Sequence, residues 1–140
     1  APGFEKLAQN LYICASALAQ YGALACFKPD SLAVYRQRHQ AFAERRNGLI
    51  PALRRLGLEI PVEPDGALYV YADISRFSDD SMRFAIELLE TAHVAVVPGA
   101  DFGNADPARY VRISYANSMD NLHEAVARIE AYLGTLCPRN

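Results

Sequence analysis

One arginine in this sequence lies in the middle of an apolar strand pattern. Arg112 lies between Val111 and Ile113 in residues 110–115, whose alternating pattern predicts a β-strand. A guanidinium on such a strand is either solvated or paired with an anion, because an unpaired charge is costly to bury. Its planar fork matches a carboxylate through two parallel hydrogen bonds. The residue pattern leaves two interpretations open: an internal ion pair or exposed sheet face, and a site for a carboxylate ligand.

The other residues that often carry chemistry are too far apart to form a site by spacing alone. They are the histidines His39, His93 and His123 and the cysteines Cys14, Cys26 and Cys137. No pair has the spacing of metal ligands or of a nucleophile and its base, so we predict no metal site and assign the histidines to the surface or to packing. An odd number of cysteines, two of them in an apolar segment, predicts free thiols acting as small hydrophobes in a reducing compartment, the cytoplasm.

Tyr69 and Tyr71 share a predicted strand face with Asp73. Two interpretations stay open for this face: the wall of a binding site, or a contact with another domain. Asp79–Asp80 precede a predicted helix, and a role as helix-capping acids explains them without catalysis.

Composition limits the partners of the chain. It has 140 residues, 51% of them hydrophobic, which is enough for one domain with a sizeable core. Its net charge of −2 gives no field that would draw it to nucleic acid or to an anionic membrane. Residues 11–27 lack formal charge, but Ser16 and Gln20 favour a buried helix over a membrane span. Six arginines of the second predicted helix form a solvated face: Arg36, Arg38, Arg45, Arg46, Arg54 and Arg55. We therefore expect no nucleic acid and no membrane as partner.

Two helices are predicted before the first strand. Apolar residues recur in steps of three and four over residues 4–27, which predicts one long opening helix. Its other faces carry alanine and glycine rather than polar side chains, so we infer a missing partner surface, in another domain or a second subunit. A second helix follows the break and cap at 29–31, with Pro51 expected to kink or interrupt it near Gly48 and Gly57 to end it.

The rest of the chain predicts a small sheet covered by helices. Alternation predicts strands over 67–74, 94–97 and 110–115, with a helix over about 80–91 between the first two and a last helix from near Ser118. The predicted fold class is α/β, an α+β sandwich of two layers. Its small, mainly antiparallel sheet of about three to four strands is packed by helices and preceded by the long apolar helix.

Three motifs follow one another in an ordered series. They are Gly66-Ala67-Leu68-Tyr69, then Val97-Pro98-Gly99 with Phe102-Gly103, then Tyr110-Val111-Arg112-Ile113-Ser114-Tyr115. Their order and spacing resemble the class I/II aminotransferases of fold type I, along essentially the whole chain. The resemblance implies that residues 1–140 are the C-terminal small domain of such an enzyme, a fragment of a longer chain that lacks the large cofactor-binding domain.

The resemblance also implies roles for particular residues. The family's active site lies between the large domain and this small one and is generally completed by a second subunit, so a homodimer is expected. Arg112 occupies the position of the arginine that binds the α-carboxylate of the amino acid or keto acid. The loop 98–103 is similar to one that comes near the site, where glycine permits close approach of the backbone. The alternative for this loop is a structural turn with Phe102 in the core.

The lysine that anchors the cofactor is the main departure from the family pattern. The cofactor of the family is pyridoxal 5′-phosphate, which forms a Schiff base with a lysine. Only Lys6 and Lys28 are present, and neither lies in a Ser-Lys segment like the family's. The phosphate-binding residues and the acidic partner of the pyridine nitrogen are likewise expected in the missing domain. We predict that this chain alone binds no pyridoxal phosphate and is inactive, whereas the full-length protein is a transaminase of amino acid metabolism.

Three alternatives remain at this stage. The chain could belong to a transcription regulator with an aminotransferase-like effector domain, which an upstream helix-turn-helix would reveal. It could belong to another fold-type I enzyme, a lyase or decarboxylase, since these also need a carboxylate anchor. It could be a free-standing ligand-binding module, which predicts a stable and monodisperse isolated domain. The choice of amino donor and keto acid lies beyond the sequence.

Overall fold

The structure is a computed structural model that describes residues 2–136. The chain divides into two compact units, residues 1–40 and 41–140, and each is described by itself. Among the described residues, the helices are all too short or too polar to cross a lipid bilayer.

The first unit holds two short helices and the beginning of a third. They are α1 (Pro2–Leu11), α2 (Ala17–Cys26) and α3 (Pro29–Arg55), of which α3 continues into the second unit. The prediction of one long opening helix is therefore wrong. The chain leaves the helical conformation at Ile13, whose φ is +63°, and Ser16 caps the restart by accepting a hydrogen bond from the Ala19 amide at 3.4 Å. The spacing of apolar residues continues through this break. A single capping serine starts a new helix without changing that spacing, so the spacing alone could not reveal the break.

Neither α1 nor α2 buries any residue within this chain. Nine large apolar side chains are 57–87% exposed: Phe4, Leu7, Leu11, Tyr12, Ile13, Leu18, Tyr21, Leu24 and Phe27. Cys14 and Cys26 are free, as predicted, and both are exposed in this chain. Cys137 lies outside the described residues. The large apolar side chains of residues 4–27, for which the sequence predicted a partner surface, are thus exposed to solvent in this chain.

Helix α3 runs through Pro51, so of the two predicted outcomes, a kink or an interruption near Gly48, the interruption is wrong. Proline removes one backbone donor and leaves the carbonyl of Asn47 without its helical partner. Asn47 and Pro51 are both exposed, so water can bind that carbonyl. Gly57 ends the helical segment as predicted, since it adopts a φ of +86°.

Three antiparallel strands form the sheet of the second unit in the order β1-β3-β2. Their bounds are β1 (Tyr69–Asp73), β2 (Val97–Pro98) and β3 (Tyr110–Ser114). The strands predicted over 67–74 and 110–115 are confirmed with shorter ends, and the one predicted over 94–97 is shifted to the two residues of β2. In the register, Tyr71 and Val97 both face Arg112, each from one neighbouring strand.

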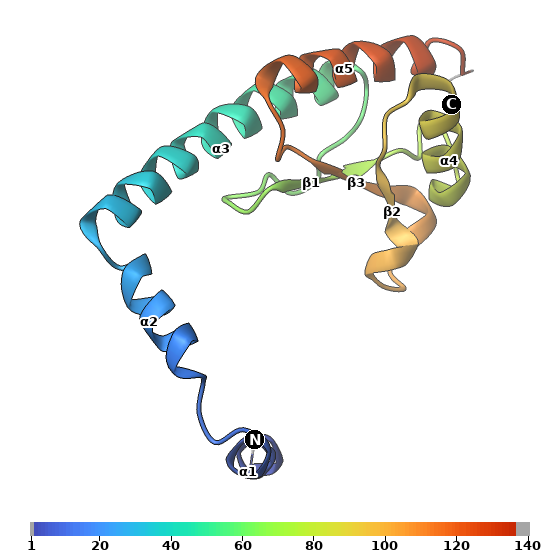
Figure 1. The fold of residues 1–140 in the computed structure, drawn as a ribbon. Helices are drawn as coiled ribbons and strands as arrows, with labels where there is room; N and C mark the ends of the chain where they lie inside the picture. Colours follow the sequence, from blue (N-terminus) through green and yellow to red (C-terminus); the bar gives the residue numbers. More distant parts are fainter. Residues whose placement is uncertain (1, 137–140) are drawn as a thin grey trace. The chain divides into compact units, whose positions relative to one another are not determined.

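Helices cover one face of this sheet (Figure 1). Helices α4 (Ser81–Ala92) and α5 (Met119–Leu133) are capped by the side chains of Asp80 and Ser118. They pack with the 41–55 part of α3 around a core in which several side chains are 0–2% exposed: Ile50, Leu53, Val70, Ala72, Leu88, Val111 and Ile129. The predicted α/β fold with a small antiparallel sheet is thus confirmed, and the odd-numbered residues of β3 point into its core.

Candidate functional site

Arg112 lies on the sheet face opposite the core. Its neighbours Val111 and Ile113 are buried among the helices, so the alternation along β3 turns Arg112 away from them. The side chain is half-buried. Because β3 is the central strand, Arg112 is flanked by residues of both β1 and β2.

The guanidinium of Arg112 contacts two aromatic rings. Its Cζ is 4.0 Å from the ring centroid of Tyr69, on β1, and 4.2 Å from that of Phe102, in the loop that follows β2. Both distances are within the range of a cation–π interaction. The Nε of Arg112 is buried, and it has no hydrogen-bond partner among residues 2–136. No salt bridge between described residues includes Arg112, which leaves its charge available for a ligand.

The nearest strand carboxylate is already satisfied by another arginine. Asp73 is 3% exposed, accepts a hydrogen bond from the Ser75 amide at 2.8 Å and pairs with Arg109 Nε at 2.6 Å. Burial alone would raise the pKa of Asp73, but the hydrogen bonds from Ser75 and Arg109 outweigh it and lower the pKa below its ordinary value. The interpretation of Arg112 as one half of an internal ion pair therefore finds no support in residues 2–136.

The loop after β2, which carries Phe102, contains a glycine at a position where a side chain would not fit. Residues Gly99–Phe102 form a short 3₁₀ turn, η1. A Cβ on Gly99 would lie 2.8 Å from the Tyr71 hydroxyl oxygen and 2.8 Å from the Tyr110 carbonyl oxygen, and closer still to the Pro107 carbonyl oxygen. Only glycine fits there, which agrees with the predicted close approach of the backbone. The alternative of Phe102 in the core is wrong, because its side chain is 45% exposed.

Tyr71 connects this loop to the sheet. Its ring stacks on Tyr110 with centroids 4.9 Å apart and meets the ring of Phe102 edge-on at 6.3 Å. Burial raises the pKa of Tyr71, and the adjacent Tyr110 adds to the effect, so the hydroxyl stays neutral at physiological pH. The sheet face that carries Arg112 is therefore lined by aromatic side chains, which is compatible with both interpretations of Tyr69 and Tyr71, a binding wall and a contact with another domain.

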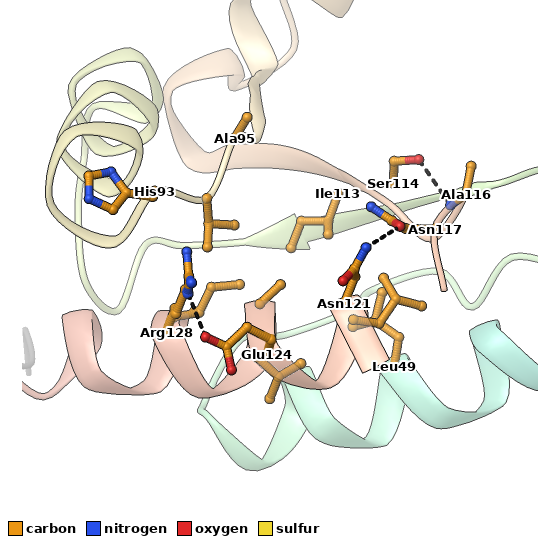
Figure 2. Close-up of a pocket in the computed structure, with 15 residues that line it drawn as sticks. Leu49, His93, Ala95, Ile113, Ser114, Ala116, Asn117, Asn121, Glu124 and Arg128 are labelled. Carbon is orange, nitrogen blue, oxygen red and sulfur yellow. Dashed lines mark hydrogen bonds and ion pairs between the residues drawn. The ribbon is translucent and has the colours of Figure 1, made fainter. Parts of the chain in front are cut away.

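A separate open pocket of about 430 Å³ lies between α5, the end of β3 and the segment after α4 (Figure 2). Its polar groups mostly bind one another. Arg128 donates to Glu124 at 2.8 Å, and Asn121 donates to Asn117 at 2.8 Å (Figure 2). His93 lines the same pocket and ends α4 with a φ of +56°. Because its charged side chains Arg128 and Glu124 pair with each other, this pocket offers less for binding an ion than Arg112 does.

The remaining sequence candidates take structural positions. His39, His93 and His123 are exposed. Among the described residues, no cluster of histidine, cysteine and carboxylate side chains could hold a metal ion. Of the pair Asp79–Asp80, Asp80 is the helix cap and accepts from the amides of Met82 and Arg83, each at 3.0 Å. The sequence analysis did not identify Phe102 as a neighbour of Arg112. The available signal was that Phe102 belongs to the 98–103 loop, which the family resemblance already placed near the site.

The residues around Arg112 do not form a site for pyridoxal phosphate. A Schiff base needs an amine, and the two lysines, Lys6 and Lys28, both belong to the first unit. The second unit offers an arginine with an unpartnered buried Nε, which suits the carboxylate of a small molecule and not an aldehyde. What these residues can do is bind and orient an anion.

Comparison with known proteins assigns the chain to a family. The sequence profile of aminotransferase class I and II matches residues 3–129, and the chain belongs to this family. It is 39% identical over 129 residues to a valine–pyruvate aminotransferase of Mycobacterium tuberculosis, across 92% of this chain and 33% of that protein. It is 34% identical over 135 residues to an aspartate aminotransferase of Thermotoga maritima, across 96% and 33% respectively.

Solved structures give the same result. A crystal structure of an aminotransferase from Mycobacterium tuberculosis matches with a TM-score of 0.87 and 37% identity, over 96% of this chain and 35% of that one. A crystal structure of an aromatic aminotransferase from Pyrococcus horikoshii matches with a TM-score of 0.81 and 34% identity, over 92% and 34%. The chain spans about a third of the length of the relatives that it matches.

Proposed function

We propose that this chain is the C-terminal small domain of a pyridoxal-phosphate aminotransferase, in which Arg112 binds the carboxylate of the amino acid or keto acid. The observation that carries the proposal is the guanidinium of Arg112, which contacts two aromatic rings on the sheet face opposite the core and forms no salt bridge among residues 2–136. The named relatives are aminotransferases, and for that reason amino-group transfer is proposed before elimination or decarboxylation.

In the proposed enzyme, Arg112 does not take part in bond making. It holds one end of the substrate, so that the carbon bearing the amino group is fixed relative to a cofactor bound by residues beyond this chain. The fork of the guanidinium sets the orientation as well as the charge of the bound carboxylate. Pyridoxal phosphate would supply the electron sink for amino transfer.

The exposed apolar helices support the idea that the full protein covers them. Helices α1 and α2 bury none of their residues within this chain, and large apolar patches on soluble proteins mark contact surfaces. We propose that the large domain or the second subunit of a homodimer covers them in a cytoplasmic enzyme. Light scattering on the full-length protein tests the dimer: a monomeric mass would contradict it.

The proposed function is tested in the full-length protein with pyridoxal phosphate bound. The twenty standard L-amino acids are screened as donors with pyruvate and with 2-oxoglutarate as acceptors. We expect transfer with at least one donor, and we expect Arg112→Gln to lower kcat/KM for that donor by about 30-fold or more. Unchanged constants in Arg112→Gln would refute the role of Arg112, and the absence of transfer with every pair would refute the assignment as an aminotransferase.

A further inference from the structure

We propose that Tyr69 and Phe102 are positioning residues for the carboxylate: their rings hold the guanidinium of Arg112 between them and direct its terminal Nη edge toward the ligand. We call these two residues the aromatic clamp. The inference rests on the proposed role of Arg112, and it adds what fixes that side chain in place.

The two rings of the clamp come from opposite flanks of β3. Tyr69 belongs to β1 on one side, and Phe102 follows β2 on the other. Cζ of Arg112 is 4.0 Å from one centroid and 4.2 Å from the other, so both rings are in contact with the guanidinium. Rings that pack against the faces of a guanidinium leave its plane open to a ligand, which is the plane that bidentate carboxylate binding requires.

Hydrogen bonds within the chain do not fix this guanidinium. Arginines are commonly oriented by acids or carbonyls that accept from their nitrogens, as Asp73 accepts from Arg109 Nε at 2.6 Å. The buried Nε of Arg112 has no such partner in residues 2–136. Because Nε is also closed to solvent, the Nη1 and Nη2 edge is the part of the fork left for a ligand. The rings therefore replace hydrogen bonds as the element that orients Arg112.

Phe102 is itself held in place. Its ring meets Tyr71 edge-on at 86°, and Tyr71 is stacked on Tyr110 across the sheet. Gly99 lets η1 approach the Tyr71 hydroxyl closely enough for this contact. Phe102 is 45% exposed, but its ring contacts both Tyr71 and Arg112. The contact with Tyr71 restrains the ring, and the restrained ring in turn restrains Arg112. Holding Arg112 in advance lowers the entropy cost of binding.

The first test measures binding without turnover. Propionate, a carboxylate without an amino group, is titrated into the full-length holoenzyme in a calorimeter. We expect Tyr69→Leu and Phe102→Leu each to raise its Kd by about 5- to 30-fold, the range of a cation–π contact that is partly removed from water. Tyr69→Phe and Phe102→Tyr keep a ring and should stay within about twofold of the wild type.

A matched control is available on α4. Met82 is 45% exposed, the same fraction as Phe102, and it belongs to α4 and not to the aromatic clamp. Met82→Leu should leave the Kd for propionate within about twofold of wild type. Circular dichroism checks the fold of each variant. Should Tyr69→Leu fail to fold, Phe102→Leu decides the test, because its side chain lies in an exposed turn.

A double-mutant cycle separates positioning from packing. If the clamp acts through Arg112, adding Tyr69→Leu or Phe102→Leu to Arg112→Gln should change the Kd by less than about twofold. In the single variants, KM for the best amino-acid donor should rise while kcat at saturation changes by less than about twofold. These two results together support positioning of the ligand through Arg112.

Four results would overturn the clamp. They are an equal loss in the Arg112→Gln background, a loss in Tyr69→Phe as large as in Tyr69→Leu, a fall in kcat with KM unchanged, and wild-type Kd in both leucine variants. If Arg112→Gln itself leaves the Kd for propionate unchanged, the proposed function fails first, and that outcome is distinct from failure of the clamp alone.

Discussion

The two units of this chain use their apolar residues in opposite ways. In residues 2–30, large apolar side chains are abundant and none is buried, whereas the second unit buries its own around a three-stranded sheet. Burial of apolar surface is the main stabilising term in folding. The second unit therefore contains the source of its own stability, whereas α1 and α2 bury none of their residues.

Arg112 and the aromatic residues around it all belong to the second unit. Arg112, Tyr69 and Phe102 are all attached to the sheet or to the turn that follows it. A rigid sheet is a better support for an oriented side chain than an uncovered helix would be.

The largest expected effect comes from comparing a leucine in each unit. Leu53 is 0% exposed and Leu18 is 87% exposed. In the 140-residue chain, Leu53→Ala should lower the free energy of unfolding by about 2–5 kcal/mol because it opens a cavity, and Leu18→Ala should change it by less than about 0.5 kcal/mol. Urea denaturation followed by circular dichroism measures both. Equal effects would contradict the division into a buried and an uncovered unit.

A smaller effect is expected at the glycine of the loop. Gly99→Ala places a Cβ against the Tyr71 hydroxyl and two backbone carbonyls. The turn must shift, at a cost of about 1–3 kcal/mol. Because Phe102 belongs to the same turn, Gly99→Ala should also weaken propionate binding by the full-length protein. Unfolding curves and calorimetry report the two effects, and a destabilised variant with wild-type binding would show that Phe102 does not depend on this turn.

The pair of Asp73 and Arg109 predicts an acid-sensitive contribution to stability. The folded pKa of Asp73 lies below its reference value of 3.8, so the ionised form stabilises the fold above that pH and the contribution is lost as the pH falls through the folded pKa. Asp73→Asn should cost about 1–3 kcal/mol at neutral pH and progressively less as the pH falls below 3.8. Urea denaturation at several pH values measures this, and a cost that does not depend on pH would contradict the assignment.

The smallest expected effect is at an alkaline pH. Burial and the hydrogen bond from the Tyr132 hydroxyl to Glu87, at 3.1 Å, raise the pKa of Tyr132 to about 12. A folded pKa above the unfolded value of about 10 means that this stabilisation is complete below pH 10 and is lost as the pH rises through 12. Tyr132→Phe should cost about 1 kcal/mol at pH 8 and flatten the loss above pH 10. An unchanged alkaline slope would contradict the assignment.

The sheet was predictable because its signals are local. The alternation in residues 67–74 and 110–115 located β1 and β3, and the serine before α5 marked its start. The break at Ile13 and the continuous helix through Pro51 were not predictable from apolar spacing. A left-handed residue and an exposed proline depend on local backbone hydrogen bonds and solvent, which the spacing of apolar residues does not encode.

The arginine was predictable, but its surroundings were not. The alternation along β3 and the order of motifs both singled out Arg112. Its contacts with Tyr69 and Phe102 depend on the pairing of β1 with β3 and on the path of the chain after β2, which are long-range features. Periodicity within one strand shows which residues share a face and not which neighbouring residues complete it.

The most direct test of the account compares a donor with and without its carboxylate. In the full-length holoenzyme, kcat/KM is measured for the best amino-acid donor and for the amine that lacks only the carboxylate, in wild type and in Arg112→Gln. The account predicts that the preference for the amino acid falls by about 30-fold or more in Arg112→Gln, with the amine nearly unaffected. A preference that is unchanged, or an equal loss for both donors, would contradict the role of Arg112 as the carboxylate anchor.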